Sequence, residues 1–288
     1  MAGLSELLPF RAATAVEPER PVLELSGTKL KVALENVLTS CEEHGGVERY
    51  IEAIKLKSQM FQKALLERDL ADLDIDTLAG LCTFMSTVRR RIAPYLTADG
   101  IERLRGALGV LLADLGDTTT ADARLAAFKA RFAENREHRW VRDFAAEILH
   151  NVSPELYPLM TRWVWDAKSN TGALREIWFG DDVDYITIPV DDKFATFLML
   201  REELAVFLSD NGFFKDILFY LDLLTAHIYA EYICAQGGTY LRTDFSSPED
   251  PMQHARRMLG LGGVKAGSLK TRLKSIDGEA FVLDDADR

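Results

Sequence analysis

Two pairs of side chains in this sequence could hold a metal ion. Glu147 and His150 stand three positions apart, and His227 and Glu231 stand four positions apart. Either spacing places both side chains of a pair on one face of an α-helix. Four-helix carboxylate proteins use Glu-x-x-His pairs to bind two metal ions inside the bundle. The pattern therefore predicts, as one hypothesis, an iron or manganese site made by Glu147, His150, His227 and Glu231.

The chain departs from that metal-binding pattern in two ways. The pattern needs two Glu-x-x-His pairs and two further glutamates. Here only Glu147–His150 matches, because His227–Glu231 has the reverse order and a spacing of four. Ordinary neighbours on a solvated helix surface have the same spacing. A metal-dependent oxidase or hydroxylase is therefore an alternative function, and the leading expectation is that no cofactor is bound.

Aromatic side chains mark a second candidate site, a pocket for a ligand or a partner. All four tryptophans lie between positions 140 and 178. Trp163 and Trp165 would point about 200° apart on a helix, so at least one faces a second neighbour, a groove or a partner. Tryptophans at helical spacing are also typical of a core. The predicted pocket residues are Trp140, Asp143, Trp163, Trp165, Trp178 and Tyr220.

Motifs for phosphate binding and for nucleophilic catalysis are incomplete. The glycine-rich run from Gly260 to Gly267 lacks the Gly-Lys-Ser/Thr order of a phosphate loop, and no clear strand precedes it. No Gly-x-Ser-x-Gly nucleophile elbow is present. The formal net charge of −11 argues against nonspecific binding to nucleic acid or to an anionic membrane.

Helices must position these candidate residues. The sequence has few prolines and is rich in helix-forming residues, which predicts a mainly α fold, an antiparallel bundle of about ten helices. At most a small β-element is expected, near Tyr185–Val190. Capping residues and apolar spacing predict helices over 26–44, 47–69, 76–94, 97–115, 120–135, 139–152, 153–168, 193–210, 213–234, 252–259 and 268–275, with a short one ending at 179.

The helix expected over 213–234 is the centre of the predicted fold, because it is apolar on most of its circumference. Its charges argue against a membrane-spanning role. Its polar residues form two stripes: Lys215, Asp222, Thr225 and Tyr229, and Asp216, Tyr220, His227 and Glu231. One stripe could face water and the other an internal site, or both could be partly solvated. We predict that the second stripe packs against the helix of Glu147 and His150.

Four regions are expected along the chain. They are a mobile N-terminal tail over 1–20, an N-terminal helical array over 21–135, a Trp-rich helical core over 136–238 and a loose C-terminal segment over 239–288. The three cysteines are far apart and form no Cys-x-x-Cys pair, which is typical of a reducing compartment. The N-terminus has no signal-peptide pattern, so a cytoplasmic location is expected.

The leading functional hypothesis is a non-catalytic cytoplasmic interaction or accessory protein. This hypothesis rests on the helical architecture, on the lack of a complete catalytic motif and on the charged ends. The partner would be another protein or a second copy of the chain. The alternative is the metal-dependent oxidase or hydroxylase. A third hypothesis is a binder of an apolar small molecule, held between the Trp-rich region and the central helix.

Overall fold

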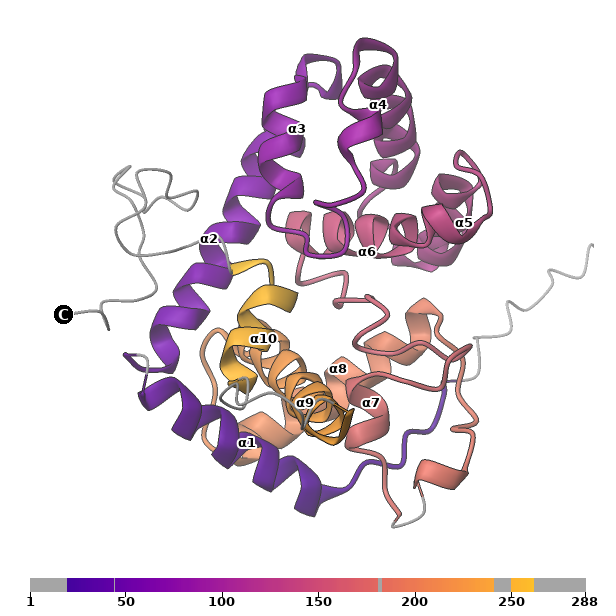
Figure 1. The fold of residues 1–288 in the computed structure, drawn as a ribbon. Coiled ribbons are helices and arrows are strands. Elements are labelled where there is room, and N and C mark those ends of the chain that lie inside the picture. The colour runs from indigo at the N-terminus through magenta and orange to yellow at the C-terminus, as the bar shows by residue number, and fades with distance from the viewer. Residues whose placement is uncertain (1–19, 44, 181–182, 241–249, 262–288) are drawn as a thin grey trace, which may run out of the picture.

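The computed structural model describes residues 20–43, 45–180, 183–240 and 250–261, and these residues confirm the predicted mainly α fold (Figure 1). The described part contains no β-strand, only two isolated β-bridges, Leu25–Trp178 and Asp166–Thr171. The ten α-helices are α1 (Gly27–Glu42), α2 (Val47–Leu65), α3 (Ile75–Cys82), α4 (Ala98–Leu112), α5 (Ala121–Lys129), α6 (Trp140–Val152), α7 (Ala173–Glu176), α8 (Phe194–Asp210), α9 (Ile217–Tyr240) and α10 (Pro251–Met258).

The helices form two groups joined along one side by α2. In Figure 1, α3, α4 and α5 lie above α6, while α1, α7, α8, α9 and α10 gather below it. Helix α2 runs along the left of both groups and contacts α1, α3, α6 and α9. One continuous apolar core extends through both groups. The apolar stripe of α2, with Tyr50, Ile54 and Phe61 buried, explains why this helix can serve both groups.

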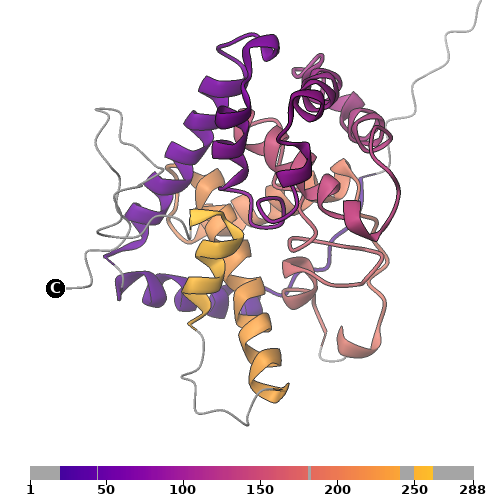
Figure 2. The same ribbon diagram turned by 45° about the horizontal axis from the view of Figure 1, so that its top comes forward.

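Helix α9 lies at the centre of the lower group. It contacts α1, α2, α7, α8 and α10, and all of residues 221–230 except Tyr229 are buried. Figure 2 shows α10 lying alongside it. Among the described helices, only the stretch Ile217–Gln236 is long and apolar enough to cross a membrane, and half of that window is buried inside the fold. Burial against five helices accounts for its apolar circumference, as in the core helix of other helical proteins.

The prediction of a helix over 153–168 is wrong. Helix α6 ends at Val152, and residues 153–172 form turns closed by the Asp166–Thr171 bridge. Pro158 cannot donate the backbone hydrogen bond that a continuing helix needs, and its ring would clash with the preceding turn. Gly172 closes the turn at a φ of 136°, and a Cβ there would lie 2.6 Å from the carbonyl oxygen of Val164.

The β-element considered near Tyr185–Val190 does not form a strand. Val183–Tyr185 is a short 3-10 helix. The backbone after it forms hydrogen bonds to a side chain and not to a neighbouring strand. The amide of Asn170 donates to the Ile186 carbonyl oxygen at 2.9 Å and accepts from the Ile188 N–H at 3.0 Å. Alternating β-branched residues favour a strand, but a strand needs a neighbouring strand, and here an Asn side chain takes that place.

Other helix boundaries differ from the prediction for local reasons. Helix α3 ends at Cys82, and residues 83–92 form turns where a helix to position 94 was predicted. Helix α9 begins at Ile217 because Asp216 has a φ of 56°, outside the helical region. Residues 250–261, part of the segment predicted to be loose, pack firmly, with Met252 and Ala255 fully buried. The predicted N-terminal tail over 1–20, apart from Arg20, and the helix predicted over 268–275 lie outside the described residues.

Candidate functional site

A buried ion pair joins α6 to α9 and is the centre of the candidate site. His150 Nε2 lies 2.8 Å from Asp222 Oδ2, and His150 Nδ1 lies 2.9 Å from the Tyr157 carbonyl oxygen. Both side chains are almost fully buried. A carbonyl oxygen can only accept, so Nδ1 donates to it. The carboxylate of Asp222 beside Nε2 favours the imidazolium form of His150, in which both nitrogens donate.

The electrostatics of His150 agree with this protonation state. Burial alone lowers its pKa, but the charge of Asp222, the hydrogen bonds to Asp222 and Tyr157, and the charge of Glu147 together raise it above the ordinary value. With both ring nitrogens occupied, His150 has no free nitrogen to act as a base or to bind a metal ion in this arrangement. The pair fastens α6 to α9 instead.

Glu147 belongs to a second buried pair, on the side of α6 that faces α2. Lys57 Nζ lies 2.8 Å from Glu147 Oε2 and also donates to the Leu259 carbonyl oxygen at 2.9 Å. Asn151 Nδ2 donates to the same carboxylate at 3.2 Å. Burial raises the pKa of Glu147, and the charge of Lys57 opposes that rise. The Lys57 ammonium thus links α2 both to α6 and to the residue that ends α10.

His227 and Glu231 face α1. His227 Nε2 lies 3.2 Å from Ser40 Oγ, and Asn36 Nδ2 donates to Glu231 Oε1 at 2.7 Å. His227 Nδ1 is 3.9 Å from Glu231 Oε2 and has no hydrogen-bond partner among the described residues. Burial lowers the pKa of His227 to about 4. His227 is therefore neutral near pH 7, unlike His150.

The four predicted metal ligands consequently divide between two places. His227 and Glu231 share a face of α9, but that face packs against α1, and it is Asp222 of the other predicted stripe that meets His150. Within the described residues, no group of three or more His, Cys, Asp or Glu side chains could hold a metal ion. The shared site expected from the sequence does not form there.

The predicted aromatic pocket residues are mostly core residues. The side chains of Trp140, Trp163, Trp165 and Trp178 are all buried. Trp163 and Trp165 lie in a turn segment and not in the predicted helix, so the angle of about 200° does not apply, and both side chains are buried. Tyr220 is only partly buried, and its ring packs against Phe213 with centroids 4.9 Å apart.

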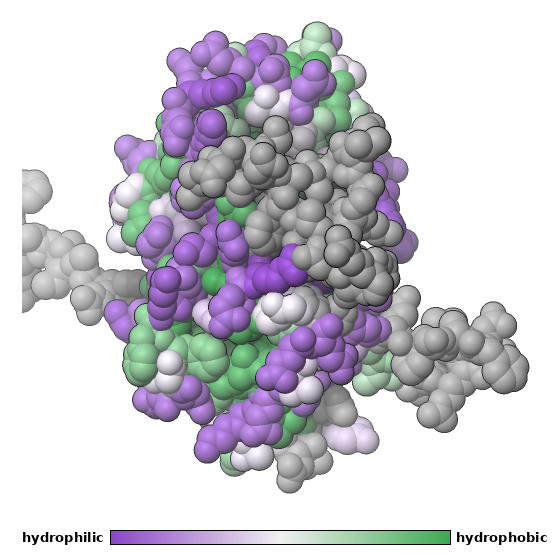
Figure 3. Space-filling model, turned by 90° about the vertical axis from the view of Figure 1, so that its left-hand side faces the viewer, coloured by the Kyte–Doolittle hydropathy of each residue, from purple (hydrophilic) through white to green (hydrophobic). Residues whose placement is uncertain are grey.

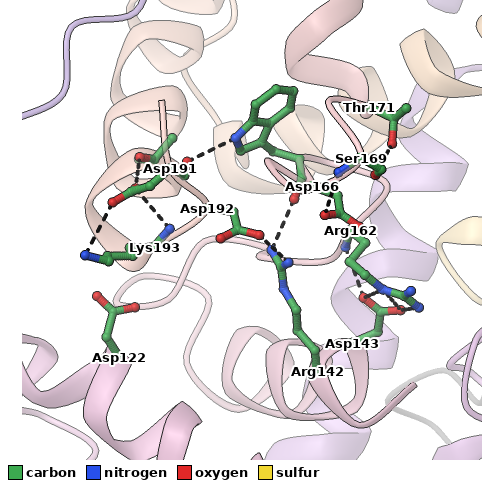
Figure 4. Close-up of polar contacts among 12 residues, drawn as sticks. Asp122, Arg142, Asp143, Arg162, Asp166, Ser169, Thr171, Asp191, Asp192 and Lys193 are labelled. Atoms are coloured by element: carbon green, nitrogen blue, oxygen red, sulfur yellow. Dashed lines mark hydrogen bonds and ion pairs between the residues drawn. The ribbon is translucent and has the colours of Figure 1, made fainter. Parts of the chain in front are cut away.

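Polar contacts hold the turn segment of the tryptophans against its neighbours (Figure 4). The buried carboxylate of Asp143 accepts from the Arg162 guanidinium at 2.6 Å and from the Arg162 backbone N–H at 3.0 Å. Trp165 Nε1 donates to the Asp191 carbonyl oxygen at 3.0 Å. Arg142 bonds both Asp192 and the Trp165 carbonyl oxygen. These contacts tie residues 162–165 to α6 and to the start of α8.

A small cavity borders the His150–Asp222 pair. It lies between residues 154–164, α8 and α9, has a volume of about 30 Å³, and is lined largely by apolar side chains, among them Phe197, Leu200, Leu204 and Leu221. Arg201 also lines it and donates to the Pro154 and Glu155 carbonyl oxygens at 3.1 and 2.9 Å. The space is large enough for a water-sized molecule. None of the predicted aromatic pocket residues lines this cavity.

Sequence reasoning missed Lys57 and the role of Asp222, although the sequence contains a signal for each. Lys57 occupies a position of the apolar stripe of α2, between Ile54 and Phe61, where a charge needs a buried partner. Asp222 stands in the middle of an apolar helix, which implies the same need. Comparisons with protein-family models, with curated proteins and with solved structures found no match to this chain.

Proposed function

We propose that the protein is a helical interaction protein that binds its partner at the α8–α9 corner. The corner consists of Val206, Phe207, Phe213, Phe214 and Ile217. The observation that supports it most directly is the exposure of two large apolar side chains, Phe214 at 79% and Val206 at 60%. Isolated exposed apolar residues are ordinary, but apolar residues gathered at one turn are typical of interaction surfaces.

The sequence of α8 supports this proposal. Its inward side is satisfied by the core, where Phe197, Leu204 and Leu208 are buried. A surface helix needs only one apolar side, yet Val206 and Phe207 continue the apolar character outward. The face seen in Figure 3, on the side of α2, also has its largest apolar area in its lower part. Apolar surface beyond what the core needs favours a partner.

Charges around the corner favour a different protein over a second copy. Glu203 and Asp210 are exposed on α8 and form no ion pair within the described residues. The chain also has a net charge of −11. Lys215 is exposed within the corner, but Glu203 and Asp210 outnumber it, so two copies meeting there would bring an excess of like charge together, whereas an apolar surface flanked by Lys or Arg would complement it. We therefore propose a partner with an apolar helix and basic flanks.

The test compares two charged variants. Val206→Asp/Phe214→Asp places charges in the corner, and Leu66→Asp places one on another exposed apolar side chain, at the far end of α2 (46% exposed). The proposal predicts that a partner protein crosslinks to the wild type and to Leu66→Asp but not to the corner variant. Equal crosslinking to all three proteins would overturn it. If light scattering shows that the wild type is a dimer and that only the corner variant is a monomer, the partner is a second copy of the chain.

A small apolar ligand is a second candidate, favoured by the cavity beside His150. The cavity lies between residues 154–164, α8 and α9, and its lining is largely apolar. Its volume restricts an occupant to a few atoms unless the walls move. Xenon binding followed by NMR tests this candidate, and Leu200→Trp, which fills the space, should abolish the shift. An unchanged spectrum of the wild type would count against it.

A reducing compartment such as the cytoplasm is proposed on separate grounds. None of the three cysteines forms a disulfide, and Cys41 and Cys82 are buried. Burial raises the pKa of both thiols to about 12, so neither ionises readily to the reactive thiolate.

A further inference from the structure

A cleft on the opposite group of helices is lined by Tyr95 and His138, and Asn135 lies behind His138 as its hydrogen-bond partner. The cleft has a volume of about 440 Å³ and lies between residues 91–97, the first turns of α4, and the short 3-10 helix Arg136–His138. Tyr95 Oη is 2.6 Å from His138 Nε2, and His138 Nδ1 is 2.7 Å from Asn135 Oδ1. A cleft of this volume is in the range of small-molecule sites.

The hydrogen bonds define which atom holds each proton. Asn135 Oδ1 also accepts from the backbone N–H of His138 at 3.1 Å, so this atom is the amide oxygen. It can only accept, and therefore His138 Nδ1 holds the ring proton. In the neutral ring, Nε2 then has the free lone pair, and the Tyr95 hydroxyl donates to it. This is the arrangement of a nucleophile, a base, and a third group that orients the base.

The fold holds the Tyr95 ring in place. The rings of Phe132 and Trp140 pack edge-on against it, each with centroids 5.6 Å away. Helix α4 begins directly beside it, where Gly100 allows a close approach, since a Cβ there would lie 2.3 Å from the Tyr95 carbonyl oxygen. The phenol is therefore half-buried and oriented, with its hydroxyl at the cleft.

Charged side chains of both signs line the same cleft. The Arg103 guanidinium lies 5.9 Å from the centre of the Tyr95 ring, and Arg91 is exposed at the rim. Asp99 and Glu137 line it as well. Arginine binds phosphate oxygens well, while two carboxylates balancing two guanidinium groups disfavour a highly charged anion. A phosphodiester, with one negative charge, fits this balance better than a phosphate monoester.

We propose that this cleft is a second site, where Tyr95 is the nucleophile toward the phosphorus of a small phosphodiester. The bond from Tyr95 Oη to phosphorus forms as the bond from phosphorus to the leaving oxygen breaks. The hydroxyl proton passes to His138 Nε2 and from there to the leaving oxygen. The product is a phosphodiester on Tyr95 and a free alcohol or phenol. Asn135 is a positioning residue, because it acts through His138. This activity goes beyond the interaction role and does not depend on it.

The probe for this step is bis(p-nitrophenyl) phosphate, and Tyr185 is the internal control. Tyr185 is 89% exposed, and its hydroxyl has no hydrogen bond within the described residues. Release of p-nitrophenolate should accompany modification of Tyr95, found by peptide mass spectrometry, at a rate roughly 100-fold above that of Tyr185, the usual contribution of a positioned base. The proposal would be overturned if the more exposed Tyr185 were modified faster than Tyr95. It would also be overturned if neither tyrosine were modified.

Variants separate the parts of the site, and none of them changes a fully buried residue. Tyr95→Phe should abolish p-nitrophenolate release, and His138→Gln should slow it by roughly 100-fold. Asn135→Asp, which keeps the acceptor oxygen, should retain the reaction, whereas Asn135→Ala should lose most of it. Arg91→Gln should raise about tenfold the probe concentration that gives half of the maximal rate, with the maximal rate of p-nitrophenolate release unchanged, as loss of a uniform binding contact does. Unchanged kinetics in His138→Gln would contradict the role of the base, and an unchanged half-saturating concentration in Arg91→Gln would contradict the phosphodiester assignment.

Discussion

His150 and His227 are both buried on helices of the same core, but their surroundings make them different chemical groups. His150 has hydrogen-bond partners at both nitrogens, one of them the Asp222 carboxylate, and its pKa is raised. His227 has a serine hydroxyl at one nitrogen and no hydrogen bond at the other among the described residues, and its pKa falls to about 4. Burial alone disfavours the charged form of an imidazole, and only a nearby anion reverses that preference.

The largest effect should come from removing Asp222. Asp222→Ala leaves His150 buried without its carboxylate, and we expect a loss of about 3–5 kcal/mol in the free energy of unfolding, the usual result of breaking a buried pair. Urea denaturation measures it. The control is Glu202→Ala, which removes a surface pair with Arg20 at 3.3 Å and should cost less than about 1 kcal/mol.

A double variant sharpens this prediction. Replacing both members of the pair, His150→Leu/Asp222→Leu, removes both charges and should recover most of the loss, because apolar residues of similar volume often substitute well for a buried pair. A double variant as unstable as Asp222→Ala would mean that packing, not the unpaired charge, causes the loss.

The second prediction concerns the opposite pH dependence of the two histidines. The unfolded chain binds a proton at His227 below pH 6.5, whereas the folded chain binds it only below about pH 4. Stability should therefore fall by about 3 kcal/mol as pH decreases through that window. In His227→Gln, the free energy of unfolding from urea denaturation should depend less on pH between about 6.5 and 4. An identical acid profile in wild type and variant would show that His227 is not held neutral.

For His150 the sign is reversed, because its pKa is raised in the folded state. Its contribution is complete below the unfolded pKa of about 6.5 and is lost as pH rises through the folded pKa. His150→Gln should therefore lower the free energy of unfolding, relative to wild type, most at acid pH. If His150 were neutral in the folded protein, the loss caused by this substitution would not increase at acid pH. The same series of urea titrations gives both histidine profiles.

The smallest effect should come from Ser40. Its hydroxyl meets a neutral His227 at 3.2 Å, so Ser40→Ala removes an uncharged hydrogen bond to the imidazole and should cost about 0.5–1.5 kcal/mol. A loss as large as that of Asp222→Ala would show that His227 is charged and would remove the contrast between the two histidines.

Several features of this protein follow from local sequence alone. The apolar stripe of α2 and the apolar circumference of α9 determine that both are helices and that one is central. Ser26 and Thr97 accept hydrogen bonds from the third residue of their helices, as N-cap residues do. The stripe of His227 and Glu231 on α9 is also a local property, since helical spacing alone places both on one face.

Only the tertiary structure decided which surfaces meet. The spacing of His227 and Glu231 cannot indicate whether α1 or α6 covers them, because both helices offer polar and apolar side chains. Asn170 pairing with the backbone at Ile186 and Ile188, and Asn135 orienting His138 toward Tyr95, likewise depend on where turns bring distant segments. Helical periodicity is set by neighbours within two turns, whereas the charge of a buried histidine is set by whichever side chain the fold places within about 3 Å of it.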